Sequence, residues 1–530
     1  MKYLRLFETE SQYETTKGDF KYPTVSYTKD ASTVHYMTLR EKYTREYFTF
    51  EALESGTFTL TIPADVNSTY MTSVSYSTDN GETWTTTTVD NTAQTITTPS
   101  VNTGSKVLWK GVGKQMAKSS YTCSYFSSTG NFNLSGNIMS LLYGDEFQDK
   151  ITFSSGSEYN FTYLFKNLAK LVNAKNLILP ATTLASYCYR YMFSRCSNLT
   201  TAPELPATTL ASNCYDNMFD GCTSLATAPE LPATTLASYC YQYMFSRCSN
   251  LTTAPELPAT TLESNCYNGM FSRCSNLTTA PELPATTLAI SCYNDMFYLC
   301  KSLTTAPVLP TTRLANSCYS GMFAGCKSLT TAPVLPATTL KNHCYSEMFR
   351  DCTSLATAPE LPATTLAAYC YNQMFDGTNV LPDCTNIDFT SQTVVASGGL
   401  RGLFEGTKVT YSDLNNILPI NGDNKPCLPV TTLAESCYAN MFYGCTSLTT
   451  APDLPATTLT KSCYNQMFSW CTKLNYIKAM FTTTPSSSYT NNWVSGVAAT
   501  GTFVKNSAAT WDETGVNGVP TGWTVETAAS

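Results

Sequence analysis

The chain has 530 residues, which is too long for one ordinary hydrophobic core and indicates several domains or a repeat array. Only 13% of the residues are charged, and the formal net charge of −7 argues against a nucleic-acid partner, which needs clustered Lys and Arg. With two histidines, His35 and His343, the chain offers little for His-based catalysis or for zinc binding.

The N-terminal region is the first element along the chain. It opens with MKYLRLFETESQYETTKGDF, in which the apolar run at 4–7 is too short for the core of a secretion signal. We therefore expect the chain to fold in a reducing cytoplasm, and no later run is apolar enough to predict membrane insertion. Residues 1–45, with a strand-like run at 22–27, are interpreted as an N-terminal attachment segment.

Residues 46–115 alternate apolar and polar side chains, as in Phe-Thr-Leu-Thr-Ile at 58–62. Such runs of period two predict several short strands, and Asn80-Gly81 is a strong signal for a hairpin turn. These features predict a small β-sandwich, with Trp84 and Trp109 in its core.

After a connector or N-terminal cap at 116–160, the sequence repeats every 26 residues, and a full copy reads LPATTLASNCYDNMFDGCTSLATAPE. One such unit cannot bury its apolar side chains alone, so the repetition predicts a stacked solenoid over 161–475, interrupted near 378–427. The Leu-Pro pair that opens each copy begins at Leu179, Leu205, Leu231, Leu257, Leu283, Leu309, Leu335 and Leu361, and again at Leu428 and Leu454.

Within a copy, the Leu-Pro step predicts an extended strand or the edge of one, because Pro has a fixed φ and donates no hydrogen bond. Leu210, Cys214, Met218 and Phe219 have helix-like spacing, which predicts a short helical or 3₁₀ segment with one buried face. Residues 476–530 leave the period, and their short apolar runs predict strands that form a C-terminal cap.

Most of the 22 cysteines follow the repeat and lie eight residues apart within a copy, as in Cys188 and Cys196. Zinc sites usually need more closely spaced pairs, which the sequence lacks. Stacked copies would bring equivalent cysteines within reach of a disulfide. A reducing compartment instead favours buried free thiols that act as small apolar side chains. Thr378 replaces the second Cys where the regular period ends.

The repeat pattern L-x-x-A-P-x-L-P-x-x-T-L-x-x-x-C-Y-x-x-M-F-x-x-C-x-x-L resembles the BspA-type (Treponema-type) leucine-rich repeat over roughly residues 160–475. FDGCTSL at 219–225 is a close match to the return segment of that family, whereas Met replaces the Ala before the Phe and a further Cys precedes the Tyr. The resemblance implies a leucine-rich-repeat solenoid. Together with the strands expected at 46–115, it gives a fold that is mainly β with short helical segments, in which an N-terminal β-sandwich module precedes the solenoid.

No motif of the sequence predicts catalysis. The run Gly111-Val-Gly113-Lys114 lacks the spacing of a phosphate-binding loop, and His343 is expected to be an exposed residue of the solenoid. Asp413 and Asp423 could line a weak cation site, but a solvated loop is the better interpretation. We therefore expect no enzymatic activity, no cofactor and no metal site.

The positions that vary between copies form a candidate binding face. They lie between the fixed Tyr and Met and after the fixed Phe, where Arg and Tyr recur, and recognition surfaces favour these two residue types. The alternative is that exposed positions simply drift. The candidates are Arg190, Tyr191, Arg195, Tyr243, Arg247, Arg273, Tyr298, Arg350 and Trp470.

The resemblance also implies a function, because Thr-rich repeats of this kind are similar to those of gut Bacteroidetes and of their phages. We expect a bacteriophage virion surface protein, a head or tail fibre component made in the host cytoplasm. Residues 1–45 would bind other virion proteins, and the solenoid would contact a host surface protein or glycan. We also expect the chain to form a homo-oligomer, and a trimer is our first guess. The alternative is a bacterial cell-surface adhesin.

Overall fold

The computed structural model describes residues 2–7, 25–30, 33–41, 45–119, 121–378, 387–392 and 394–528, and the chain forms two compact units, Met1–Tyr47 and Phe48–Ser530. The first unit is an antiparallel sheet in the order β1-β3-β2, made of β1 (Lys2–Phe7), β2 (Val25–Asp30) and β3 (Thr33–Glu41). The predicted strand at 22–27 overlaps the start of β2, and its residues 22–24 lie outside the described residues.

The second unit begins with two sheets that pack face to face through aromatic rings. Phe50 on one sheet and Phe58 on the other have ring centroids 4.6 Å apart. One sheet has the order β12-β11-β4-β9-β6-β7 and the other β10-β5-β8. The strands are β4 (Phe48–Ala52), β5 (Phe58–Ile62), β6 (Met71–Ser77), β7 (Thr85–Thr88), β8 (Gln94–Thr97), β9 (Lys106–Gly113), β10 (Tyr125–Ser128), β11 (Phe132–Asn137) and β12 (Leu171–Ile178).

The sequence signals in these sheets are confirmed with one exception. Asn80 and Gly81 both have positive φ, at 61° and 90°, in the connection between the antiparallel strands β6 and β7. Trp109 is fully buried, as predicted. The prediction that Trp84 is a core residue is wrong, because it precedes the edge strand β7 and lies half-buried beneath the Lys110 ammonium, which is 4.1 Å from its ring.

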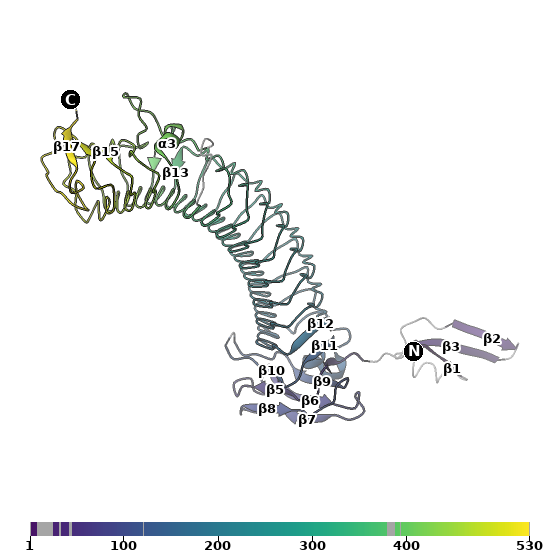
Figure 1. Ribbon diagram of the computed structural model, residues 1–530. Coiled ribbons are helices and arrows are strands. Elements are labelled where there is room, and N and C mark those ends of the chain that lie inside the picture. The colour runs from purple at the N-terminus through teal and green to yellow at the C-terminus, as the bar shows by residue number, and fades with distance from the viewer. Residues whose placement is uncertain are drawn as a thin grey trace. The chain divides into compact units, whose positions relative to one another are not determined.

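From the first repeat onward, successive copies stack on one another (Figure 1). Equivalent side chains form ladders inside the stack: the rings of Phe219 and Phe245 lie 5.6 Å apart, and those of Tyr215 and Tyr241 lie 5.8 Å apart. The Cys, Tyr, Met and Phe of each complete copy are at most 1% exposed. Each apolar side chain is therefore covered by its counterparts in the neighbouring copies, which a single copy could not achieve.

The predicted helical segment of each copy is instead a chain of tight turns, here called the turn row (187–196 and its equivalents in other copies). Along it the N–H groups alternate between two kinds of partner. The N–H of Arg190 donates to the Tyr187 carbonyl within the copy, whereas the N–H of Tyr191 donates to the Asp216 carbonyl of the next copy. The apolar residues are spaced four apart, which mimics a helix, but a helix would bond every N–H within its own copy.

The Leu-Pro step is also not a strand, because the described repeats show only isolated parallel bridges beside it. Those bridges join equivalent threonines, as in Thr227 with Thr253 and Thr253 with Thr279. The two prolines of each Ala-Pro-x-Leu-Pro run donate no hydrogen bond, so the pairing cannot extend from one threonine to the next.

The interruption near 378–427 leaves the turn row continuous. The N–H of Gln373 donates to the Arg401 carbonyl, so a copy that begins 28 residues later takes the place of the regular neighbour. In this region β13 (Thr365–Leu366), which belongs to the preceding regular copy, pairs in parallel with β14 (Val394–Val395), and the inserted residues include the helix α3 (Tyr411–Ile417). At the start of the interruption, the Thr378 hydroxyl donates to the Phe375 carbonyl.

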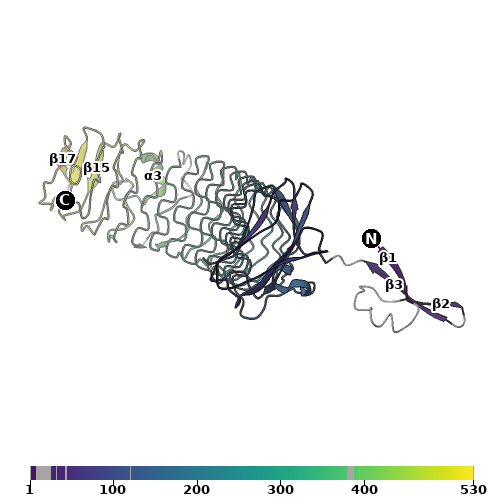
Figure 2. The ribbon, with the colours of Figure 1, turned by 90° about the horizontal axis from the view of Figure 1, so that it is seen from below.

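The end of the stack is covered by a parallel sheet in the order β15-β16-β17 (Figure 2). Its strands are β15 (Tyr476–Ala479), β16 (Thr502–Lys505) and β17 (Thr524–Thr527), and the buried rings of Trp493 and Trp511 pack beside them. Apart from α3, the described helices are the short α2 (Ser140–Tyr143) and η2 (Gly144–Glu146), so the chain is mainly β, as expected. Among the described residues, no helix is both long and apolar enough to cross a membrane.

Candidate functional site

The turn row carries three columns of residues whose φ is positive, the conformation that favours glycine. Bulky side chains occupy many of these positions because the hydrogen bonds to both neighbouring copies hold the backbone in place. The first column is Tyr187, Asn213, Tyr239, Asn265, Ser291, Ser317, His343 and Tyr369; the second is Tyr191, Asn217, Tyr243, Gly269, Asp295, Gly321, Glu347 and Gln373; the third is Arg195, Gly221, Arg247, Arg273, Leu299, Gly325, Asp351 and Gly377.

Copies lie closer together at these columns than in the core of the stack. The ring of Tyr191, in the second column, lies 4.8 Å from the ring of Tyr163, its counterpart in the copy before. The buried rings of Tyr241 and Tyr267 are 5.8 Å apart. The stack therefore bends towards the turn row, whose closely spaced turns are visible in Figure 1. The variable side chains thus lie on the inner side of the bend.

A groove of about 420 Å³ runs across this surface, and it brings together six of the nine predicted binding residues. Arg195 lies beside it in the third column, whereas Arg350 and Trp470 belong to later copies. The groove is lined by Arg190, Tyr191, Asp216, Asn217, Gln242, Tyr243, Ser246, Arg247, Ser272, Arg273, Asp295 and Tyr298.

Two of the groove arginines are held by buried carboxylates that the sequence analysis did not select. The Arg190 Nε lies 2.6 Å from an Asp216 oxygen, and the Arg247 Nη1 lies 3.0 Å from an Asp220 oxygen. Burial raises the pKa of Asp216, and the hydrogen bond from Arg190 opposes that rise. Arg190 and Asp216 are 26 residues apart in the sequence, and Arg247 and Asp220 are 27 apart. These separations equal the repeat period or exceed it by one, so the sequence alone could have suggested both pairs.

The ring of Tyr243 lies over the backbone of the next copy at Gly269. A Cβ placed on Gly269, whose φ is +60°, would meet a ring carbon at 2.1 Å. Trp470, which is 56% exposed, packs in the same manner against Gly496. A glycine in one copy therefore makes room for a large side chain from the copy before it.

Other cations of the surface have no carboxylate partner among the described residues. The Arg273 guanidinium lies 5.7 Å from the Tyr298 ring, and Lys166 lies 4.2 Å and 4.7 Å from the rings of Tyr163 and Tyr191. Arg195 likewise makes no ion pair with a described residue. These charges remain available for an external anion.

Further along the turn row the surface becomes acidic. Arg350 lies between two acids, with Nη1 at 3.0 Å from Glu347 and Nε at 3.2 Å from Asp376. Burial, reinforced by Glu405, raises the pKa of Asp376 to about 6. Burial, reinforced by Glu347, raises the pKa of Asp295 to about 6 as well.

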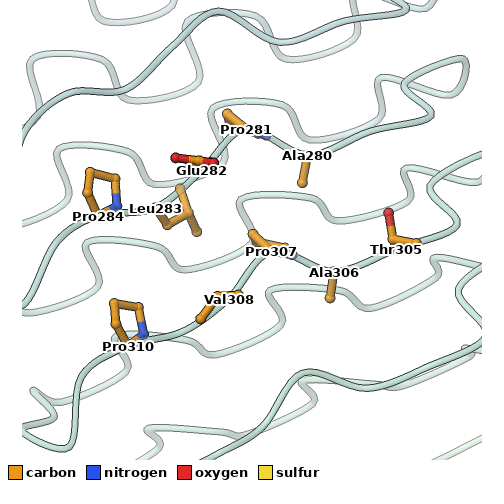
Figure 3. A pocket seen from close by; sticks show the side chains of 10 residues that line it. All are labelled: Ala280, Pro281, Glu282, Leu283, Pro284, Thr305, Ala306, Pro307, Val308 and Pro310. Atoms are coloured by element: carbon orange, nitrogen blue, oxygen red, sulfur yellow. The ribbon is translucent and has the colours of Figure 1, made fainter.

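A second hollow, of about 380 Å³, lies between successive Ala-Pro-x-Leu-Pro segments (Figure 3). Its wall includes Val308, which is 79% exposed, and the equivalent Val334 of the next copy is 74% exposed. Other copies carry a glutamate at this position: Glu204, Glu230, Glu256, Glu282 and Glu360.

The remaining sequence candidates have structural roles. His343 is exposed, as predicted, and its ring stacks on Tyr369 with centroids 4.9 Å apart. Asp413 forms the capping box at the start of α3, and Asp423 pairs with Lys478 at 2.9 Å, so neither is free to line a cation site. The described residues include no group of three potential metal ligands of the His, Cys, Asp or Glu type.

The prediction of buried free thiols is confirmed for the described cysteines. All 21 of them are free, and each is buried except the half-buried Cys427, whereas Cys384 lies outside the described residues. In the stack the second cysteine of each copy donates to a carbonyl of the preceding copy, as Cys248 does to Phe219 at 3.2 Å. Burial raises the pKa of Cys214 to about 12, which keeps it a thiol and a poor nucleophile.

Comparison with known families gives one match. The model of the BspA type leucine rich repeat region, described with six copies, matches residues 162–304, 216–356, 264–391 and 429–500. These ranges together cover more than half of the chain. No match was found among the curated proteins or among the solved structures.

Proposed function

Because the chain belongs to the BspA-type leucine-rich repeat family, we propose that it is a non-enzymatic surface protein that adheres to a host through its turn row. The repeats of this family suggest an adhesion-type surface protein. The observation that carries the proposal is the contrast between an invariant ladder core and three surface columns, mostly half-buried, whose side chains differ from copy to copy. Tyr, Arg, Asn, Ser and Gly dominate those columns, as they do in antibody binding loops.

We also propose that the chain is a bacteriophage virion component, in a head or tail fibre. Its support is the order along the chain, in which a separate strand-bearing unit precedes the sheets and the repeats. The first unit would bind other virion proteins and form a homo-oligomer, with a trimer as the first expectation. The host ligand would be a surface protein or a glycan. A bacterial cell-surface adhesin is the second candidate, and membership of the repeat family favours it.

Adhesion is tested with the full chain, labelled and added to gut Bacteroidetes cells. Replacing Tyr243 and Arg247 by alanine is expected to abolish binding, because both side chains line the groove. The control is Val334→Ala, which alters an exposed side chain on the Leu-Pro side. Equal binding by all three proteins would exclude the turn row as the adhesive surface.

The virion assignment has its own test, which is mass spectrometry of purified phage particles. Stoichiometric peptides from this chain would place it in the virion. Their absence, together with recovery of the chain from bacterial envelopes, would leave the adhesin.

A further inference from the structure

Positive charge gathers at the N-terminal end of the turn row, although the whole chain carries a net charge of −7. Between 159 and 273 the turn row holds five cations, Lys166, Arg190, Arg195, Arg247 and Arg273, and two acids, Asp216 and Asp220. Each acid is already paired with Arg190 or Arg247. Glu158, Glu263 and Asp295 border this stretch. An excess of cations therefore faces the inner side of the bend.

The cations also crowd one another. Burial and the neighbouring charges of Arg195 and Arg190 lower the pKa of Lys166, although Asp220 opposes that effect. The Lys166 ammonium sits over two stacked tyrosine rings. An external anion placed here would relieve the repulsion among these groups.

The backbone of the turn row is not available to a ligand. Of two successive N–H groups, one donates within its own copy and the other donates to the next copy. The carbonyls of Tyr187 and Tyr189 accept within the copy, and those of Cys214 and Asp216 accept from the copy before. A peptide strand therefore finds no free edge to pair with, and a ligand must be recognised by side chains alone.

The side chains around these cations suit a sugar chain. Tyr187, Tyr191 and Tyr239 offer half-buried or partly exposed rings that can pack on the apolar face of a pyranose. Asn217 and Gln242 lie between them and offer amide donors and acceptors for hydroxyl groups.

Building on the proposed adhesive function, we propose that the turn row between 159 and 273 binds an acidic oligosaccharide, whose carboxylate or sulfate groups pair with Lys166, Arg195 and Arg273. Guanidinium groups favour such planar or tetrahedral anions because they donate two parallel hydrogen bonds. Asp295 marks the C-terminal limit of the site, since the surface beyond it is acidic.

The test uses matched pairs of probes with the full chain in isothermal titration calorimetry. Hexagalacturonate is compared with its full methyl ester, and a heparin-derived hexasaccharide with the neutral hexamer of N-acetylglucosamine. We expect binding of at least one acidic probe, none of its neutral counterpart, and an affinity that falls steeply with added salt. The carboxylate and sulfate arms identify which anion is preferred.

Variants then place the site. Arg195→Gln and Arg273→Gln are each expected to weaken the acidic probe about tenfold. Both should fold, because Gln373 and Gln466 already occupy positive-φ positions of the same stack. The matched control is Arg313→Gln, which removes one charge from an exposed arginine near the threonine bridges, and it should leave affinity unchanged.

Several outcomes would overturn the inference. One is a failure of both acidic probes to bind, and another is an equal loss of affinity in the control variant. Binding of poly-glutamate as tightly as of the sugars would show a general polyanion surface instead. If the acidic probes fail while cells still bind in a manner that depends on Tyr243 and Arg247, the adhesive function stands and only the acidic ligand is excluded.

Discussion

Bulky side chains at positive φ distinguish this chain at the scale of single residues. Tyr191 and Arg195 have φ values of 54° and 62°, a region that few side chains other than Asn, Asp and Gly adopt. Hydrogen bonds to the copies on both sides hold the backbone, so the choice of side chain is left to surface chemistry. That freedom explains how one backbone can display Tyr, Asn, Glu, Arg and Trp in turn.

Gly269→Ala tests how glycine makes room for Tyr243. The new Cβ would lie 2.1 Å from the Tyr243 ring, and the residue would hold a φ of +60°. We expect a loss of about 1–3 kcal/mol in the free energy of unfolding, measured by urea denaturation, and a displaced ring. Gly422→Ala is the control, because nothing lies within 4 Å of its Cβ position, and it should change stability little.

Asp295→Asn tests the acidic limit of the groove. Burial raises its pKa to about 6 in the folded chain, well above the ordinary range of an aspartate, so the folded state binds the proton more tightly. The stabilisation from that proton is present below about pH 4 and is lost as pH rises towards 6. We expect the variant to be more stable than the parent by about 1–2 kcal/mol at neutral pH and nearly equal to it at pH 4. Identical urea midpoints across this range would contradict the assignment.

At the scale of elements, the turn row differs from the helix that its spacing predicts. Leu210, Cys214 and Met218 recur every four residues, a pattern that a helix and a row of turns both satisfy. The stack selects the turns because they direct alternate N–H groups to the next copy. Likewise, the prolines that mark the predicted strand also prevent its pairing from extending beyond single threonine bridges.

Phe245→Ala tests the ladder as the source of stability in these elements. The ring is fully buried between Phe219 and Phe271, with centroids 5.6 Å and 5.8 Å away. We expect a cost of about 3–5 kcal/mol, seen by hydrogen exchange as faster opening of the adjacent copies. Tyr239→Ala removes a ring that is 38% exposed and should cost much less. Equal costs would show that the ladder is not the main stabilising element.

At the scale of the whole molecule, the repeats behave as modular layers, each coupled to its nearest neighbours. Each copy exchanges hydrogen bonds with the copies before and after it. Stability of such an array is approximately a sum of repeat and neighbour contributions. The interruption near 378–427 shows the same property, because the backbone hydrogen bonds between copies continue, from the Phe375 N–H to the Leu403 carbonyl, despite the inserted residues.

Removal of one complete copy, residues 231–256, tests this modular behaviour. The ladders on both sides would meet in register, so we expect a folded chain with an unchanged circular dichroism shape and a slightly smaller hydrodynamic radius. Cell binding should nevertheless be lost, because the deletion removes Tyr243 and Arg247. Removal of only 231–243 breaks the register and should unfold the neighbouring copies. A deletion of the full copy that unfolds the chain would refute the modular description.

The sequence by itself determined the period, the identity of the ladder residues and the surface on which variation collects. These follow from local repetition, because a side chain that recurs every 26 residues must meet its own counterpart once copies stack. The candidate face could therefore be selected, and six of its nine residues share the groove. The buried partners of its arginines, Asp216 and Asp220, were missed. Their separations of 26 and 27 residues mark them as neighbours across copies, but only the structure shows that both carboxylates are buried.

Only the tertiary structure decided the path of the backbone and the burial of individual side chains. Whether an N–H bonds within its own copy or to the next one depends on the neighbouring copy, which no local spacing records. Trp84 shows the same limit, since its burial depends on β7 being the edge of its sheet rather than on its own strand pattern. Hydrogen-bond partners and burial are properties of contacts distant in sequence, and they are settled only when the copies and sheets come together.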